Sequence, residues 1–399
     1  MTPTWSFHSA AQIVFGAGSV ENLGALVANL PARRVLVITD QHLAKAGIVD
    51  RVLTALKVAD LHVDIFDGGL PEPALRVADE CARYAKPLRP DALIGLGGGS
   101  NMDLAKITAV ILTHGGVARD YVGEARIPGP ILPVVCVPTT AGTGSEVSCS
   151  GVLTDDENDV KVSTLSNYLR PRVAIVDPRL TRTCPRQVTA DSGIDALTHA
   201  IEAYTATDSA DLLPEHKSIY QGSNPLSDAL AEKAIALVGA NLVRAVEQPD
   251  DLPAREGMAL GATLAGLAFS NAGVALVHAL EYPVGAATHC SHGAGNGLFL
   301  PYVMRFNLSV RAGRMARIAA LLGEDVQGLS EQQAAQRAIE AVERLNRQIG
   351  IPLRLRELGT QREQLPALAE KTFAIKRLLR INPRPAALAD LVSLLESAY

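Results

Sequence analysis

The sequence predicts an α/β domain built on a mostly parallel sheet, followed by an all-α domain. Short apolar runs alternate with helical patterns through the first half of the chain, and glycine-rich loops follow two of these runs. Strand patterns then end near Thr189, after which apolar residues recur at helical spacing. Because 399 residues suit two domains, we expect an α/β domain at 1–188 and a helical domain at 189–399.

The predicted strands are compact runs rich in β-branched residues. They lie at 34–39, 61–66, 92–96, 131–137 and 173–176. Helical patterns at 52–56 and 77–85 fall between the first three. Strand–helix repetition of this kind indicates parallel strands with helices on both faces of the sheet.

Helix boundaries in the second half are marked by capping residues. Asn224 followed by Pro225 predicts a helix that runs to about Val246. Ser330 and Gln333 form a capping-box pattern for a helix ending at 349, where Gly350 stops it. The segment 257–280 has no charged residue and could imitate a membrane span, but its polar residues favour a buried core helix.

Composition excludes several function classes. The chain has 37 Lys and Arg against 42 Asp and Glu, a net charge of −5, which argues against nucleic acid as a partner. Its five cysteines are scattered and odd in number, as expected for reduced thiols. With no signal-peptide pattern at the N-terminus, we expect a cytoplasmic protein without a membrane partner.

Two glycine-rich loops follow predicted strands. Gly97-Gly98-Gly99-Ser100 precedes a helical pattern, and the loop at 138–146 is rich in glycine and hydroxyls, including Thr139 and Thr140. Glycines let the backbone approach a ligand, and a helix N-terminus offers N–H groups to phosphate. Each loop alone could be a simple turn, but two at the ends of parallel strands favour a nucleotide site.

Asp40 ends the first long strand. An acidic residue at that place can accept a hydrogen bond from the ribose 2′-hydroxyl of NAD and repel the 2′-phosphate of NADP. The alternative is an aspartate that caps the next helix.

Four residues suggest a metal site. Asp195 and His199 are four apart on one helical face, and His278 and His292 follow further along the chain. One carboxylate and three imidazoles suit Fe(II), Zn(II) or Mn(II). Such an ion could polarise a substrate oxygen as a Lewis acid. The alternatives are a solvated aspartate, a core histidine at 278 and a loop histidine at 292.

Four long motifs, in order and at matching spacing, resemble the iron-containing (group III) alcohol dehydrogenases. They are Gly98-Gly99-Ser100-x-x-Asp103-x-x-Lys106, the loop at 138–146, the segment 195–202, and the stretch from Phe269 through His278 to His292-Gly293. The resemblance implies a Rossmann-like dinucleotide-binding domain and a helical domain, in a dehydroquinate synthase-like architecture. It also implies homodimers or larger assemblies.

The resemblance implies specific site residues. It implies metal ligands at Asp195, His199, His278 and His292. It implies cofactor contacts from Asp40, Gly98, Gly99, Ser100, Asp103, Thr139, Thr140, Lys161 and Leu180. Two positions depart from the family pattern: Tyr282 stands where a proton-relay histidine is frequent, so it becomes the candidate catalytic acid, and Glu72 stands where asparagine is frequent.

The predicted function is a metal-dependent, NAD(P)-linked dehydrogenase that interconverts a small alcohol or hydroxy acid with its aldehyde or ketone. A hydroxy acid would need a cation for its carboxylate, and Lys217 is one candidate. Residues 220–228 and the His-x-x-x-Tyr-Pro at 278–283 are similar to hydroxyacid–oxoacid transhydrogenases, an alternative that pairs 4-hydroxybutyrate with 2-oxoglutarate. A more distant alternative is an NAD- and metal-dependent lyase like dehydroquinate synthase.

Overall fold

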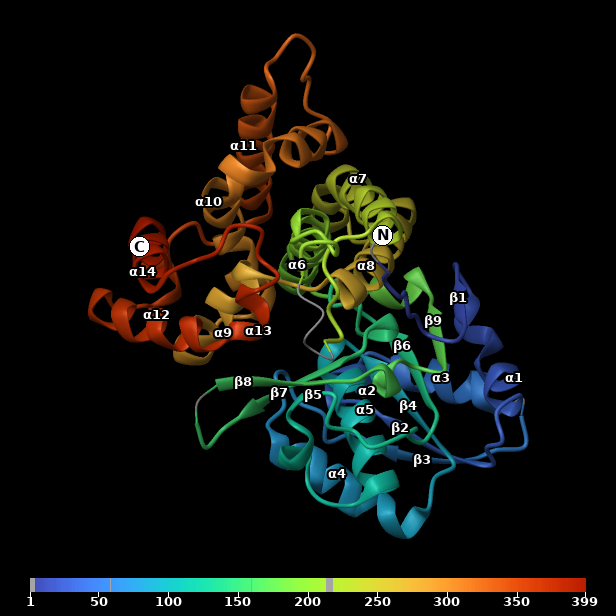
Figure 1. The fold of residues 1–399 in the computed structure, drawn as a ribbon. Coiled ribbons are helices and arrows are strands. Elements are labelled where there is room, and N and C mark those ends of the chain that lie inside the picture. The colour runs from blue at the N-terminus through green and yellow to red at the C-terminus, as the bar shows by residue number, and fades with distance from the viewer. Residues whose placement is uncertain (1–3, 58, 159, 213–217) are drawn as a thin grey trace. The chain divides into compact units, whose positions relative to one another are not determined.

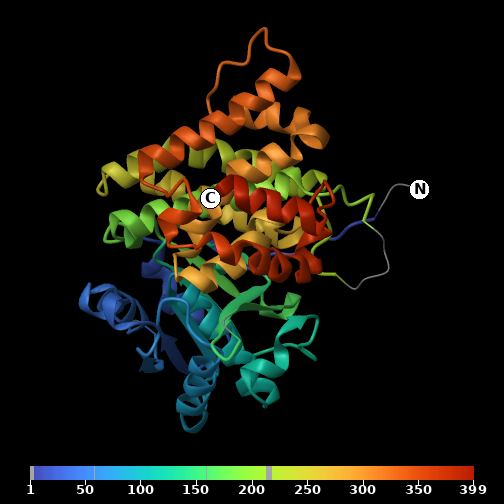
Figure 2. The ribbon, with the colours of Figure 1, turned by 90° about the vertical axis from the view of Figure 1, so that its left-hand side faces the viewer.

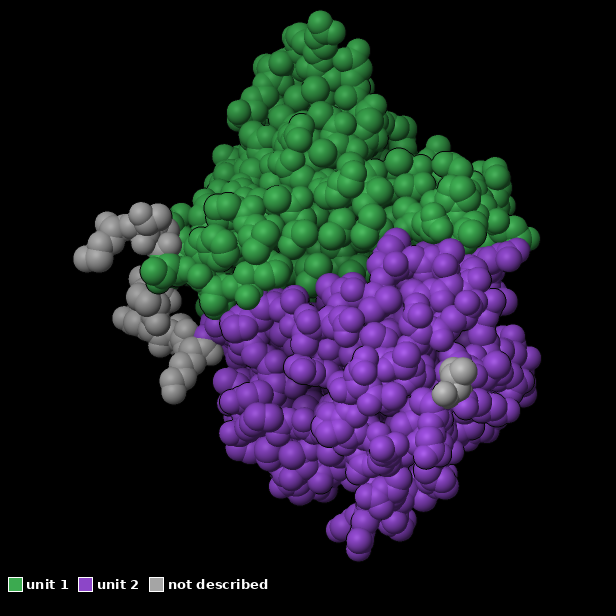
Figure 3. All heavy atoms as spheres, turned by 90° about the vertical axis from the view of Figure 1, so that its right-hand side faces the viewer, with its two compact units in different colours: residues 1–7, 185–216, 220–399 green, residues 8–184, 217–219 purple. Residues whose placement is uncertain are grey.

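The computed structural model describes residues 4–57, 59–158, 160–212 and 218–399, so Lys217 lies outside the described residues (Figure 1). The described chain divides into two compact units, coloured separately in Figure 3. Residues 8–184, joined by 218–219, form an α/β unit. Residues 185–212 and 220–399, joined by 4–7, form a helical unit.

The α/β unit is built on a six-stranded parallel sheet in the order β1-β9-β6-β4-β2-β3. The strands are β1 (Ile13–Phe15), β2 (Arg34–Ile38), β3 (His62–Phe66), β4 (Ala92–Gly97), β6 (Val134–Pro138) and β9 (Val173–Val176). All five predicted strands are confirmed. β1 was not predicted, because its three residues are too few for a strand pattern and two of them, Ile13 and Phe15, are exposed.

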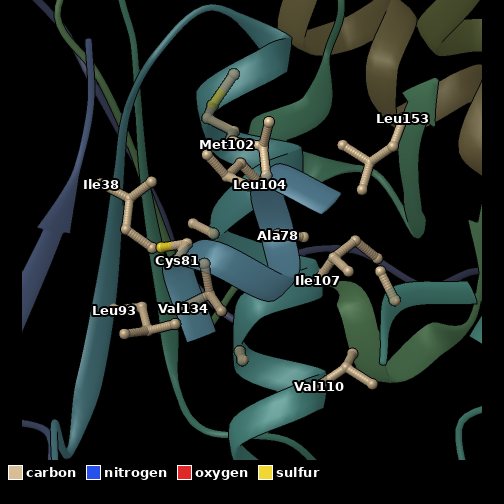
Figure 4. Close-up of a cluster of buried hydrophobic side chains, with 14 of the residues drawn as sticks. Ile38, Ala78, Cys81, Leu93, Met102, Leu104, Ile107, Val110, Val134 and Leu153 are labelled. Carbon is tan, nitrogen blue, oxygen red and sulfur yellow. The ribbon is translucent and has the colours of Figure 1, made fainter. Parts of the chain in front are cut away.

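Helices cover both faces of this sheet, as predicted. The helices of this unit are α1 (Leu23–Ala28), α2 (Gln41–Lys45), α3 (Ile48–Leu56), α4 (Leu75–Leu88) and α5 (Gly99–His114). Successive residues of a strand point to opposite faces. Accordingly Leu36 and Ile38 join a cluster with α4 and α5 (Figure 4), whereas Val35 and Val37 join a second cluster with α1 and α3.

A small second sheet was not predicted. It contains β5 (Gly123–Glu124), β7 (Ser150–Asp155) and β8 (Val160–Leu165) in the order β5-β8-β7, with β7 and β8 antiparallel. The polar residues Ser150, Thr154 and Lys161 interrupt the apolar pattern of the hairpin. Tertiary contacts, not local pattern, therefore define these strands.

The helical unit holds no strand among its described residues. Its helices are α6 (Arg186–Thr205), α7 (Pro225–Glu247), α8 (Leu252–Ala272), α9 (Leu276–Thr288), α10 (His292–Leu321), α11 (Glu331–Ile349), α12 (Leu365–Ala374), α13 (Lys376–Leu379) and α14 (Leu388–Ala398). The Asn224 cap and the Ser330 capping box are confirmed, and Gly350 ends α11 in the left-handed conformation. α12 and α14 lie side by side in Figure 1 and Figure 2.

The prediction of one core helix over 257–280 is wrong. α8 ends at Ala272 and α9 starts at Leu276, with Gly273 between them at φ +113°. A Cβ on Gly273 would lie 3.0 Å from the Cβ of Tyr220, so this residue permits both the turn and the packing. No single described helix is long and apolar enough to cross a membrane; α8 and α9, bent by 103°, meet those criteria only as a pair.

Candidate metal and cofactor sites

The carboxyl ends of β2 and β4 form a topological switch point in the α/β unit. The chain passes from β2 outward to β3 and then returns to β4 on the other side of β2. Open parallel sheets bind ligands outside the strand ends at such a point. Asp40 follows β2, and Gly98 and Gly99 follow β4, where they open the 16-residue helix α5.

The two glycine-rich loops are in contact at this end of the sheet. The N–H of Thr139 donates to the carbonyl of Gly97 at 3.0 Å. A Cβ on Gly98 would lie 3.5 Å from Thr140, in ordinary contact, whereas one on Gly99 would lie 2.8 Å from the Thr143 side chain. Gly99 therefore has no space for a side chain. Glycine at this position lets the N-terminus of α5 pack closely against the loop at 138–146.

Asp40 caps α2, the alternative left open by the sequence. Its Oδ1 accepts from the N–H groups of His42 at 2.8 Å and Leu43 at 3.0 Å. Its Oδ2 accepts from the side-chain amide of Asn101 at 2.7 Å. These contacts hold the Asp40 side chain at the switch point. The Asn101 side-chain amide also donates to the carbonyl of Leu96 at 3.0 Å, so it links the ends of β2 and β4.

Two predicted cofactor residues on α5 have different surroundings. Asp103 is buried, and its carboxylate accepts from the Ser145 hydroxyl at 2.5 Å and the Val152 N–H at 2.9 Å. Lys106, fully buried, lies 3.4 Å from the same carboxylate. Asp103 therefore ties α5 to the loop at 138–146 and to the β7–β8 hairpin. Ser100, the other predicted residue, accepts a hydrogen bond from the N–H of Glu72 at 3.2 Å.

The two remaining predicted cofactor residues, Lys161 and Leu180, lie in different environments, one in an ion pair and the other in the hydrophobic core. The Lys161 Nζ lies 3.0 Å from Glu72 Oε1, so the residue that departs from the family pattern forms an ion pair with the predicted cofactor lysine. Glu72 adopts φ 47°, a rare conformation for a non-glycine residue. Leu180 is fully buried in the hydrophobic cluster on the α1 and α3 side of the sheet, so its side chain is a core residue.

The helical unit brings together three of the four predicted metal ligands. One ligand atom each from Asp195, His278 and His292 lie within 4.8 Å of one another. They come from the middle of α6, the first turn of α9 and the start of α10. Asp195 and His278 are buried, and His292 is partly buried.

The fourth predicted ligand, His199, lies beside this group. Its Nδ1 is 3.8 Å from Asp195 Oδ2, and its ring stacks on that of His278 with centroids 4.8 Å apart. The His199 ring also stacks on the ring of Phe269, with centroids 4.2 Å apart. His199 therefore contacts Asp195 and His278 but is not one of the three residues whose ligand atoms lie within 4.8 Å of one another.

Two buried glutamates orient the histidines. Glu202 Oε2 lies 2.5 Å from Nδ1 of His278, and Glu281 Oε2 lies 2.5 Å from Nδ1 of His292. A carboxylate accepts the Nδ1 proton and leaves the Nε2 lone pair for a metal. Glu202 also accepts from the Val277 N–H at 2.7 Å, which fixes the start of α9.

Asn296 marks the point toward which the ligand atoms converge. Its Nδ2 lies 2.8 Å from Asp195 Oδ1, 3.2 Å from His278 Nε2 and 3.1 Å from His292 Nε2. The amide donates to Asp195 Oδ1. The Nε2 atoms of His278 and His292 present lone pairs to the same place when the two glutamates hold their Nδ1 protons. One carboxylate and unprotonated imidazole nitrogens fit a divalent metal such as Fe(II), Zn(II) or Mn(II).

The charges of the site favour an ionised aspartate. Burial acts to raise the pKa of Asp195, but the imidazoles of His199, His292 and His278 and the Asn296 amide outweigh it, so the pKa is lowered. A carboxylate ligand must be deprotonated to bind a metal.

Local sequence explains how α10 delivers His292. Ser291 caps α10 by accepting from the Ala294 N–H, and its hydroxyl donates to Asp191 on α6 at 2.6 Å. A Cβ on Gly293 would lie 1.9 Å from the Asp191 carbonyl, so only glycine lets α10 approach α6 this closely.

The sequence analysis missed Glu202, Glu281 and Asn296. Spacing could have found them, since Glu202 is seven residues after Asp195, Glu281 is three after His278, and Asn296 is four after His292, all helical intervals. Tyr282, the predicted acid, is buried with its ring 6.1 Å from that of His292.

The chain is similar over its whole length to known enzymes. The iron-containing alcohol dehydrogenase family model matches residues 10–178, and the model for the C-terminal part of that family matches residues 189–399. The NAD-dependent methanol dehydrogenase of Bacillus methanolicus is 38% identical over 385 residues, 96% of this chain and 97% of that protein. Long-chain-alcohol dehydrogenase 1 of Geobacillus thermodenitrificans (strain NG80-2) is 40% identical over 400 residues, 98% of this chain and 97% of that protein.

The fold of this chain is also similar to solved structures of alcohol-oxidising enzymes. A crystal structure of 1,3-propanediol oxidoreductase has a TM-score of 0.93 and 36% identity, covering 99% of this chain and 100% of that one. Both family models and these full-length matches carry the same assignment. The chain therefore belongs to the iron-containing alcohol dehydrogenase family, and it is an oxidoreductase that acts on CH–OH groups.

Proposed function

We propose that this protein is an NAD-linked, divalent-metal-dependent dehydrogenase of a small primary alcohol or hydroxy acid. The observation that carries the proposal is the convergence of Asp195, His278 and His292 on one point, with a glutamate behind each of those two histidines. Iron is the first candidate metal because the family is iron-containing, and zinc and manganese are alternatives because one carboxylate and three imidazoles suit all three ions.

The residues of the helical unit would hold the metal as follows. Asp195, His199, His278 and His292 would be its ligands, and Glu202 and Glu281 would keep the two glutamate-bound imidazoles in the tautomer that exposes Nε2. When bound, the metal supplies Lewis acidity and the nicotinamide accepts or donates a hydride. Tyr282, close to His292, would hold a proton for the substrate oxygen.

In the α/β unit, the proposed cofactor site is the switch point between β2 and β4. The α5 N-terminus with Gly98, Gly99 and Ser100, and the adjoining Thr139 and Thr140, would receive the pyrophosphate. Lys161 would add a cation and Asp40 a fixed negative charge.

A metal-loading assay tests the proposal. Protein stripped with a chelator and reloaded with Fe(II) should form NADH from NAD and a primary alcohol, and the stripped protein should not. His278→Ala should lose most bound metal and activity. Full metal content together with full activity in that variant would contradict the ligand set.

Asp40 is proposed to select NAD over NADP. Asp40→Asn keeps the capping oxygen but removes the charge, so the ratio of kcat/KM for NAD to that for NADP should fall while thermal stability stays near wild type. Asp40→Ala removes both and should lower stability by about 1 kcal/mol as well. An unchanged cofactor ratio in Asp40→Asn would exclude this role.

The relatives described above are named dehydrogenases and an oxidoreductase. They give no support to the transhydrogenase or to the lyase as the activity of this chain.

A further inference from the structure

Glu72, the residue that departs from the family pattern, contacts two residues of the proposed cofactor site. Its Oε1 is 3.0 Å from Nζ of Lys161, a residue of β8 (Figure 1). Its N–H donates to Oγ of Ser100, in the first turn of α5. One residue therefore joins the proposed cofactor lysine to the helix N-terminus proposed for the pyrophosphate.

The two members of the ion pair between Glu72 and Lys161 differ in exposure. The Lys161 side chain is 5% exposed, whereas that of Glu72 is 38% exposed. The carboxylate can therefore turn into solvent at little cost, while packing holds the lysine side chain in place. Glu72 is thus the exchangeable partner of a fixed cation.

The backbone at residue 72 does not require a glutamate. Glu72 adopts φ 47°, a conformation in which asparagine is enriched and most other residues are uncommon. Its carbonyl accepts from the Thr154 hydroxyl at 3.2 Å, and the Thr154 N–H donates to the carbonyl of Pro73 at 2.9 Å. Backbone contacts therefore hold this loop, so a purely structural role does not account for the carboxylate.

We propose that the Glu72 carboxylate competes with the cofactor pyrophosphate for Lys161, so that NAD and NADH bind loosely and leave between turnovers. The inference rests on the proposed function, because the cofactor contact of Lys161 belongs to it. Carboxylate and phosphate oxygens are alternative partners of one ammonium group. The free energy of cofactor binding is therefore reduced by the free energy needed to separate Lys161 from Glu72.

Removing the charge of Glu72 should strengthen cofactor binding. Glu72→Gln keeps the length of the side chain, and Glu72→Asn suits the backbone conformation. Both variants should bind NADH about 10-fold more tightly than wild type, as expected when a charge-assisted hydrogen bond no longer competes. Calorimetric titration with NADH measures the affinity with no alcohol present.

Three further variants separate the charge from other effects. Glu72→Asp keeps the charge in a residue type that tolerates this conformation, and it should bind NADH no more tightly than wild type. Glu80→Gln removes an exposed ion pair with Arg76 on α4 and should leave the NADH affinity unchanged. Lys161→Gln should weaken NADH binding, and in that background Glu72→Gln should bring no gain.

Thermal unfolding gives a second readout. Glu72→Gln takes a carboxylate away from a buried ammonium group, so the melting temperature of the cofactor-free variant should fall. The same concentration of NADH should then raise the melting temperature of Glu72→Gln more than that of wild type, because the tighter ligand stabilises the folded state more.

The outcomes distinguish this inference from the proposed function. A lower melting temperature in Glu72→Gln with unchanged or weaker NADH binding would overturn the inference and leave the proposed function intact. An equal gain from Glu72→Gln in the Lys161→Gln background would also overturn it. If no primary alcohol reduces NAD in wild type while both neutral variants bind NADH more tightly, the proposed function fails and the competition stands.

Discussion

At the scale of single residues, two carboxylates define the chemistry of the histidines. Glu202 and Glu281 each lie 2.5 Å from an Nδ1 atom and leave the opposite nitrogen facing Asn296. Metal-binding histidines depend on such partners for tautomer and orientation. The proposed ligand role of His278 and His292 therefore depends on two glutamates that would not touch the metal themselves.

Glu281→Gln tests this dependence. We expect the affinity for Zn(II) or Fe(II) to fall about 10- to 100-fold, because a neutral acceptor holds the His292 Nδ1 proton less well. Competition with a chromophoric chelator measures the affinity. Glu363→Gln, at an exposed glutamate, should bind like wild type, and an unchanged affinity in Glu281→Gln would show that His292 is oriented without it.

At the scale of elements, close helix packing decides whether the ligands meet. α10 begins against α6, and the contact between Gly293 and the Asp191 carbonyl leaves no space for a Cβ. Asp195 and His199 on α6 can then share a site with His292, although nearly a hundred residues separate them in the sequence.

Gly293→Ala should disturb this contact. A Cβ placed 1.9 Å from a backbone oxygen forces α10 away from α6, so we expect lower stability and loss of tight metal binding. Thermal unfolding and metal analysis measure both effects. Gly129→Ala makes the same chemical change where the nearest atom would be 3.8 Å away, and it should be tolerated. Normal metal binding in Gly293→Ala would contradict the packing argument.

Capping stabilises α11 without help from distant residues. The Ser330 hydroxyl accepts from the Gln333 N–H, and the Gln333 side chain accepts from the Ser330 N–H. Ser330→Ala should lower the free energy of unfolding by about 1 kcal/mol. Chemical denaturation measures it, with Ser393→Ala, an exposed mid-helix serine, expected to cost nothing. Equal effects of the two changes would argue against the cap.

At the scale of the whole molecule, burial controls the reactivity of the thiols. Burial raises the pKa of Cys81 to about 12, although a hydrogen bond with Thr108 opposes it, and burial also raises the pKa of Cys136 to about 12. Cys149 shifts in the same direction. At pH 8 a thiol with a raised pKa is almost entirely protonated, and protonated thiols are poor nucleophiles.

We therefore expect iodoacetamide to leave Cys81, Cys136 and Cys149 unlabelled in the native protein at pH 8. In denaturant the thiols become accessible with ordinary pKa values, so all three should react. Peptide mass spectrometry after a timed pulse checks this. Rapid native labelling of Cys136 would mean that the α/β unit opens far more readily than its buried sheet indicates.

The sequence by itself determined the elements that local rules define. β-branched runs gave five strands of the parallel sheet, and caps at Asn224 and Ser330 marked helix starts, because these signals act over a few residues. Local pattern was wrong at 257–280, where a glycine turn divides an apolar stretch, and it missed the hairpin of β7 and β8.

Only the tertiary structure decided which residues share a site. Asp195, His278 and His292 were proposed as ligands from sequence, but their distance to one another, and the presence of Glu281 and Asn296 among them, depend on how α6, α9 and α10 pack. Local propensity acts along the chain, whereas a site is made by long-range packing, which no short segment encodes.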